Sequence, residues 1–283
     1  MTNEQSQVFF NPDDDAEMVR ASELARASFR YFWRELSWER RRITPALDLA
    51  AVKIEFTDEE PLLLGALPPV EHMWVSDVDF DGYFVAGRLM NQPNWVRGVR
   101  TGDLVRVPLT QIDDWMYSRF DRAYGGFTVN LMRSRMAPLE LHGHDDGWGL
   151  EFGDPADVQV MANYAAENPP DEKKPGLFGR NRSRQPQSAP PLDLDAEHPM
   201  ALNLVPAYIE QVRHTPSILH HRDERGWTQL HHFALGGSAA CTQVMLDYGA
   251  DPRAVTNSGL SAAQLAHSLG WTDVVELLQR HGG

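Results

Sequence analysis

The residues best suited to chemistry form two pairs in the first half of the chain. Glu71 and His72 are adjacent, as are Asp113 and Asp114, and a tryptophan follows each pair closely. A carboxylate beside an imidazole is the material of general acid–base catalysis, and a tryptophan wall would raise carboxylate pKa values by desolvation. One interpretation of the sequence is therefore a hydrolase or ligand-binding enzyme that uses these four residues.

The spacing within the pairs favours a structural role instead. Neighbouring residues of a regular strand point to opposite faces, so Glu71 and His72 would not face the same pocket. Asp113 and Asp114 directly precede Trp115. This order suits a turn or a helix cap, in which an aspartate accepts backbone N–H groups and the tryptophan anchors the turn. We therefore weigh a non-enzymatic protein above an enzyme.

A group of metal-binding residue types lies further along the chain. His142, His144 and Asp145 are close in sequence, and their donor atoms suit zinc or another transition metal. The two histidines would share one face of a strand, but a closed zinc site needs four ligands, and no further cluster has matching spacing. Gly143 between them indicates a flexible turn. We predict no metal site and no other cofactor.

The composition excludes several classes of protein. The 283 residues include 40 acidic and 26 basic side chains, a net charge of −14, so we expect no DNA partner. The single cysteine, Cys241, excludes an internal disulfide and a cysteine-rich zinc site. Neither a glycine-rich phosphate loop nor a nucleophile elbow occurs. Because the sequence has no long apolar run and no signal peptide, we expect a cytoplasmic protein without membrane contact.

The spacing of apolar residues predicts an α+β fold for the first half of the chain. A helix capped by the aspartates at 13–15 is predicted, because apolar residues from Met18 to Leu36 recur every three or four positions. Turn signals then separate short strands, which we predict near 50–56, 71–78, 83–89, 104–109 and 127–132. A second helix is predicted over 154–164. These elements predict a helix packed on a small antiparallel sheet.

The segment over 166–199 is predicted to be a linker. Its prolines are interleaved with charged and polar residues, and apolar side chains are scarce. Such a segment cannot bury enough surface to offset its ordering entropy. We therefore predict an N-terminal α+β domain over 1–165 and a C-terminal domain over 200–283.

The C-terminal domain repeats itself with a period of 33 residues. Gly226 aligns with Gly259, and the segment over 223–231 resembles the start of an ankyrin repeat, whose period is 33. One face of a helix is visible over 204–212. The resemblance predicts a short all-α array of an N-terminal half repeat plus two repeats. Because about three repeats are usually needed for stability, we expect the array to lean on the N-terminal domain or on a partner.

The resemblance to ankyrin repeats implies protein binding rather than catalysis. The candidate partner-binding residues stand at the hairpin tips and after a helix-joining glycine, and they are Arg225, Trp227, Ser258, Leu260 and Trp271. Large apolar groups at exposed tips make good anchors, because aromatic side chains carry much of an interface's energy. The alternative is that the two tryptophans pack against a neighbouring repeat or against the N-terminal domain.

Motifs of the N-terminal domain resemble the YegJ-like family of bacteria. The motifs occur in order at 52–56, 71–75, 112–116 and 125–128, within a likeness that extends roughly from residue 15 to residue 135. The family carries no established activity. Its combination with ankyrin repeats implies an accessory or interaction role.

Together these observations predict a non-enzymatic protein that binds a protein partner through its ankyrin array. The net charge of −14 would speed association with a cationic partner. A sharper hypothesis is therefore an immunity or antitoxin-like protein that masks a basic toxin domain. A bacterial adaptor or scaffold protein, and an enzyme of the N-terminal domain, are the alternatives.

Overall fold

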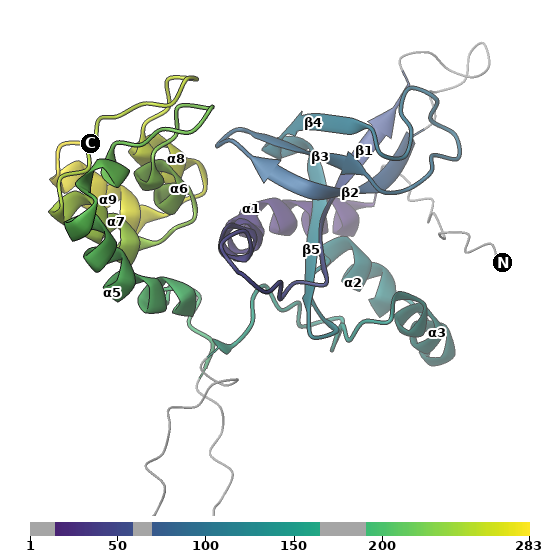
Figure 1. Ribbon diagram of the computed structural model, residues 1–283. Helices are drawn as coiled ribbons and strands as arrows, with labels where there is room; N and C mark the ends of the chain where they lie inside the picture. Colours follow the sequence, from purple (N-terminus) through teal and green to yellow (C-terminus); the bar gives the residue numbers. More distant parts are fainter. Residues whose placement is uncertain (1–14, 59–69, 165–190) are drawn as a thin grey trace, which may run out of the picture.

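The computed structural model describes residues 15–58, 70–164 and 191–283 (Figure 1). These residues form an N-terminal helix on an antiparallel sheet and a C-terminal array of helices, so the predicted α+β class is confirmed. The array lies against the α+β part, and the buried apolar residues of the two form one continuous core. The predicted linker falls outside the described residues as far as residue 190.

Six strands form a single sheet in which every neighbouring pair is antiparallel. In chain order they are β1 (Leu49–Thr57), β2 (Val70–Phe80), β3 (Phe84–Leu89), β4 (Leu104–Pro108), β5 (Ile112–Arg119) and β6 (Arg122–Gly125). Their order across the sheet is β4-β3-β2-β1-β5-β6. A short 3-10 turn, η1 (Leu109–Gln111), joins β4 to β5. The four strands predicted before residue 110 are confirmed.

Helix α1 (Ala16–Glu39) covers one face of this sheet. The Asp15 carboxylate caps it by accepting the N–H groups of Glu17 and Met18. On the sheet side, Phe29 packs edge-on against Phe80 of β2 with ring centroids 5.4 Å apart. The alternation that predicts β1 places its apolar residues toward this helix.

Two segments of the chain are not what their local sequence predicts. The strand predicted over 127–132 is wrong, because these residues belong to helix α2 (Phe127–Ser134). The backbone turns at Gly126, whose φ is 69°, and the Asp114 carboxylate accepts the N–H groups of Phe127 and Thr128. The first turn of α2 is therefore capped by a residue of β5 that is distant in sequence.

The helix predicted over 154–164 is also wrong for the residues before 164, which form turns and irregular chain. The carbonyls of Glu151 and Gln159 accept the N–H groups of Ala123 and Gly125 at 2.9 and 2.8 Å. This segment therefore covers the β6 edge of the sheet instead of forming a helix. Before it, helix α3 (Pro138–Trp148) replaces the turn predicted around Gly143.

The C-terminal array consists of helices stacked in antiparallel pairs. Its elements are α5 (Pro199–His214), the 3-10 turn η2 (Pro216–Leu219), α6 (Gln229–Leu235), α7 (Ala239–Asp247), α8 (Ala262–Ser268) and α9 (Thr272–Arg280). Capping boxes begin α6 at Thr228 and α8 at Ser261. These two residues occupy the same position of the 33-residue repeat, so the repeat has a structural counterpart.

The array rests on α1 through aromatic side chains. Trp38 of α1 stacks on His198 with ring centroids 5.4 Å apart and planes 10° apart. Tyr31 meets Trp271 edge-on at 6.3 Å. The guanidinium of Arg30 donates to the carbonyl of Gly270 at 3.1 Å. The array therefore leans on the N-terminal domain, as its short length predicts.

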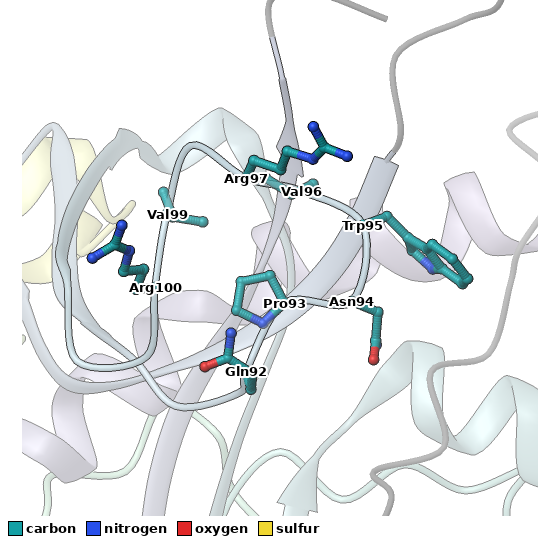
Figure 2. Close-up of a pocket in the computed structure, with 8 residues that line it drawn as sticks. All are labelled: Gln92, Pro93, Asn94, Trp95, Val96, Arg97, Val99 and Arg100. Carbon is teal, nitrogen blue, oxygen red and sulfur yellow. The ribbon is translucent and has the colours of Figure 1, made fainter. Parts of the chain in front are cut away.

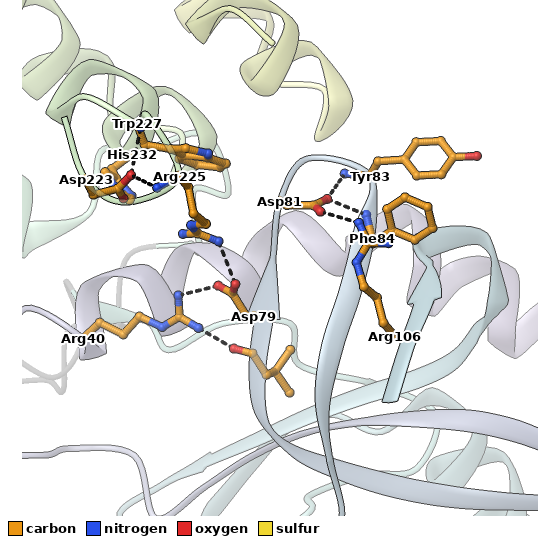
Figure 3. Close-up of polar contacts among 11 residues, drawn as sticks. Arg40, Asp79, Asp81, Tyr83, Phe84, Arg106, Asp223, Arg225, Trp227 and His232 are labelled. Carbon is orange, nitrogen blue, oxygen red and sulfur yellow. Dashed lines mark hydrogen bonds and ion pairs between the residues drawn. The ribbon is translucent and has the colours of Figure 1, made fainter. Parts of the chain in front are cut away.

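The hairpin between β2 and β3 touches the array as well. Asp79 accepts from Arg40, the residue directly after α1, at 3.0 Å and from Arg225 of the first repeat at 2.7 Å (Figure 3). A Cβ added at Gly82 would lie 2.5 Å from Leu265 Cδ2 and 3.5 Å from Leu260 Cδ1. The hairpin and the first helix of the second repeat are therefore in close contact.

We expect Gly82→Ala to destabilise the protein through this contact. Gly82 has φ +97°, so alanine costs about 1–2 kcal/mol of backbone strain, and overpacking against Leu265 adds about 1–3 kcal/mol. Gly102→Ala is the matched control, since φ is +87° there and an added Cβ meets nothing within 4 Å. Urea unfolding of both variants measures the difference. Equal losses of stability would contradict the contact.

Candidate functional sites

The four candidate catalytic residues do not form one site. Glu71 and His72 lie next to each other in β2 and point to opposite faces, as the strand rule predicts. The Glu71 carboxylate is 1 % exposed and accepts the N–H groups of Asn94 and Trp95. It therefore holds backbone in place on the other side of the sheet from His72.

A bulge in β5 brings both aspartates toward the face of His72. Lys53 of β1 pairs with Asp114 while Ile54 pairs with Ile112, so Asp113 is the extra residue between them. His72 Nδ1 lies 2.7 Å from Asp113 Oδ2, and the two side chains are 25 % and 18 % exposed. The carboxylate contacts Nδ1 and so orients the imidazole ring.

Asp114 is committed to structure. It is fully buried, and its two oxygens accept from the backbone N–H groups of Trp115, Phe127 and Thr128 and from the Thr128 hydroxyl. Burial raises the pKa of this carboxyl. The turn or helix cap predicted at the aspartate pair is wrong, because these residues lie in strand β5; Asp114 does accept backbone N–H groups, but those at the start of the distant helix α2.

Lys53 is the member of this cluster that sequence interpretation missed. Its Nζ lies 3.2 Å from Thr128 Oγ1 and 6.0 Å from the centre of the Trp74 ring. Burial lowers the pKa of the lysine, while the charges of Asp114 and Asp113 oppose that shift. In the sequence, Lys53 is distinguished only as a charged residue at one of the polar positions of a strand in which polar and apolar residues alternate. The cluster thus brings a His72–Asp113 pair and a partly buried lysine to the same face of the sheet.

The predicted metal-binding types point in different directions. His142 and His144 are two residues apart on helix α3, about 200° around its axis, so they do not share a face. His144 contacts Asp145, whose carboxylate also accepts from Arg133 at 2.7 and 2.8 Å. Among the residues that the structure describes, no group of three His, Cys, Asp or Glu side chains could hold a metal ion.

The predicted partner-binding residues divide into buried and exposed ones. Trp227 and Trp271 are only 3 % and 5 % exposed, so they pack inside the protein rather than standing as free anchors. Arg225 contacts Asp79, and Leu260 is half-buried near the β2–β3 hairpin. Ser258 is exposed at the hairpin tip. The sequence could not show which face of the array turns toward the N-terminal domain.

Comparison with known proteins identifies the family. Residues 15–152 match the family described as "Uncharacterized protein conserved in bacteria (DUF2314)". A protein of Neisseria meningitidis serogroup B (strain MC58), named "Putative ankyrin repeat protein NMB1133/NMB1171", is 38% identical over 278 residues, which cover 98% of both chains. This chain belongs to the DUF2314 family.

A further relative agrees with the resemblance found in the motifs. The "Uncharacterized protein YegJ" of Escherichia coli (strain K12) is 34% identical over 83 residues, which are 29% of this chain and 49% of that protein. The predicted YegJ-like and ankyrin resemblances are thereby confirmed. In the described parts of the chain, no helix combines the length and the apolar character needed to cross a membrane.

The DUF2314 domain carries a preorganised loop over 91–100, between β3 and β4 (Figure 2). Three carboxylates hold its backbone: Glu71 accepts two N–H groups, Asp58 accepts two more, and Asp103 accepts one. Sequence interpretation assigned only a turn to the start of this loop. The sequence did not predict these hydrogen bonds, because each joins a carboxylate side chain to a backbone N–H group and forms only in the folded protein.

We expect Asp114→Asn to destabilise the DUF2314 domain by about 3 kcal/mol, because it leaves a buried N–H group unpaired and removes a charge beside Lys53. Asp113→Asn is the control, since Asp113 is partly exposed and its carboxylate pairs only with His72 among the residues that the structure describes; it should cost about 1 kcal/mol or less. Urea unfolding measures both. The assignment fails if Asp113→Asn costs as much.

The array should lose stability on acidification through His232. Burial lowers the pKa of His232 to about 4, and the nearby charge of Arg41 acts in the same direction. The neutral form is therefore favoured in the folded state, so this contribution is present above pH 6.5 and is lost as the pH falls toward 4. The thermal unfolding temperature should fall less steeply between pH 7 and pH 4 for His232→Gln than for the wild type. Identical profiles would show that His232 does not contribute.

Proposed function

We propose that this protein is a non-enzymatic interaction protein whose ankyrin array and DUF2314 domain act as one unit. An external protein partner binds the exposed hairpin tip of the second repeat. The observation that carries the proposal is how the array's surface is used: one side of it contacts the DUF2314 domain, while Val255, Asn257 and Ser258 of the tip remain exposed. Ankyrin arrays present extended surfaces for protein partners, and here part of that surface has an internal partner.

The internal contact determines where an external partner can bind. The side chains of Trp271, Phe233 and Leu265 are all buried, and each faces the DUF2314 domain or the neighbouring helix. A partner that used this side would first have to displace α1. Such a displacement would expose several aromatic side chains to water, which is costly. We therefore propose that the partner binds the exposed residues of the hairpin tip, next to Leu260, which lies against the β2–β3 hairpin.

The hairpin tip of the second repeat is both exposed and ordered. Val255 is 44 % exposed, and Asn257 and Ser258 are also exposed. Thr256 N donates to the carbonyl of Leu260 at 2.9 Å, which closes the turn. Asn257 N donates to Arg225 O at 2.9 Å and so ties the tip to the first repeat. A tip that is already ordered loses less conformational entropy when a partner binds.

The immunity hypothesis is supported by the net charge of the whole chain, but the charge of the array itself supports it less. The net charge of the chain is −14, but Pro199 to Gly283 carry seven acidic and five basic side chains. Most of the acidic excess therefore lies outside the proposed partner surface. An antitoxin-like role against a basic toxin predicts that partner binding weakens steeply with salt.

An enzyme that uses all four candidate residues has less support than binding. Glu71 lies on the other face from His72, and the oxygens of Asp114 are occupied by donors of the protein itself. The His72–Asp113 pair beside Lys53 is what a ligand-binding or catalytic proposal would rest on. An adaptor or scaffold role is compatible with the same partner surface.

We expect Val255→Arg to abolish capture of the partner by the full-length protein. The substitution places a charge on the exposed apolar side chain of the tip. Leu139→Arg is the matched control, because Leu139 is 85 % exposed on α3. Affinity capture with quantitative mass spectrometry should find one protein retained by the wild type and the control and depleted at least tenfold by Val255→Arg. Equal retention by both variants would refute the proposed surface.

A further inference from the structure

We propose that the loop over 91–100 of the DUF2314 domain binds an acidic peptide segment of a protein, with Trp95 as the apolar anchor and Arg97 and Arg100 as the charge partners. This site is separate from the hairpin tip of the array. It concerns a different surface and a different chemistry from the proposed function.

The loop backbone is held before any ligand arrives. Val96 is 6 % exposed and packs into the core, and Val99 is partly buried against it. Asp58 Oδ1 accepts the Gly98 N–H at 2.9 Å, and Asp103 Oδ2 accepts the Arg100 N–H at 2.8 Å. Together with those to Glu71, these hydrogen bonds fix a segment that has no regular secondary structure. Because the loop is already ordered, it loses less conformational entropy when a ligand binds.

The side chains between these hydrogen-bonded positions point outward. Trp95 is 55 % exposed, and Arg97 and Arg100 are both exposed. The loop lines an open cavity of about 520 Å³, and Figure 2 shows these three side chains projecting away from Pro93 at its middle. Tryptophan and arginine are the residue types enriched where interfaces gain most of their energy.

The two arginines differ from the other arginines of this corner. Arg106 of β4 contacts Asp81 at 2.9 Å, and Arg88 of β3 lies 3.9 Å from Asp77. For Arg97 and Arg100, no carboxylate of the described residues lies within salt-bridge distance. A guanidinium recognises a carboxylate through two parallel N–H···O bonds, so these two side chains suit glutamate or aspartate of a partner.

A peptide fits this site better than a nucleic acid does. A nucleic acid strand would extend its phosphates across a chain whose net charge is −14, and the attraction of two arginines would be opposed by that field. A short acidic segment needs complementary charge only at the loop. Its apolar side chains can lie against Trp95 while its carboxylates reach the arginines.

The test uses the full-length protein and a fluorescein-labelled peptide of alternating glutamate and leucine residues, followed by fluorescence anisotropy. We expect Arg97→Glu combined with Arg100→Glu to weaken binding at least tenfold, and Trp95→Ala to weaken it at least threefold. Arg20→Glu combined with Arg280→Glu is the matched control, because both arginines are exposed elsewhere and the change in net charge is the same. This control should change the affinity less than twofold.

Four results would overturn the proposal. They are no binding of the peptide by the wild type, equal loss in the control, equal binding of a peptide with glutamine in place of glutamate, and equally tight binding of an oligothymidine through the same loop residues. Val255→Arg should bind the peptide as the wild type does. The two proposals can therefore fail independently, since each has a variant that leaves the other surface intact.

Discussion

Helix α1 is buried from two sides, and both halves of the protein depend on it. Its Phe29 side fills the core against the sheet, while Trp38 and Tyr31 on another side cover the array. Burying one such side chain stabilises a fold by about 1.5–3 kcal/mol. Two and a half repeats are short for an independent array, and α1 supplies the apolar neighbour that a further repeat would otherwise provide.

The parts of the fold that were predictable from the sequence are those coded by local patterns. The spacing of apolar residues indicated α1, the alternation of polarity indicated β1, and turn signals delimited the strands from β2 to β4. The 33-residue period indicated the array. By contrast, α2 begins because Asp114 of β5 accepts its first N–H groups, and the irregular segment before residue 164 is held where the Gln159 carbonyl accepts from Gly125 of β6. Both depend on contacts that exist only after the chain has folded.

The candidate sites show the same division. The strand rule correctly separated Glu71 from His72, because that rule needs only two adjacent residues. The meeting of Lys53 with both aspartates required the bulge at Asp113, and the order of the loop over 91–100 required three distant carboxylates. Neither the bulge nor the ordering of the loop can be recognised from a short stretch of sequence. The burial of Trp227 and Trp271 likewise follows from the side on which the array docks.

The long separation in sequence between α1 and its contacts in the array matters during synthesis. Arg30 contacts Gly270, 240 residues later, so the ribosome needs roughly 10–50 s to deliver the array after α1 has emerged. During that interval the sheet can cover the Phe29 side of the helix, but nothing in the nascent chain covers the side of Tyr31 and Trp38. The growing polypeptide therefore exposes an aromatic surface for most of its translation. Transiently exposed apolar surface of this kind is prone to aggregation until the array covers it.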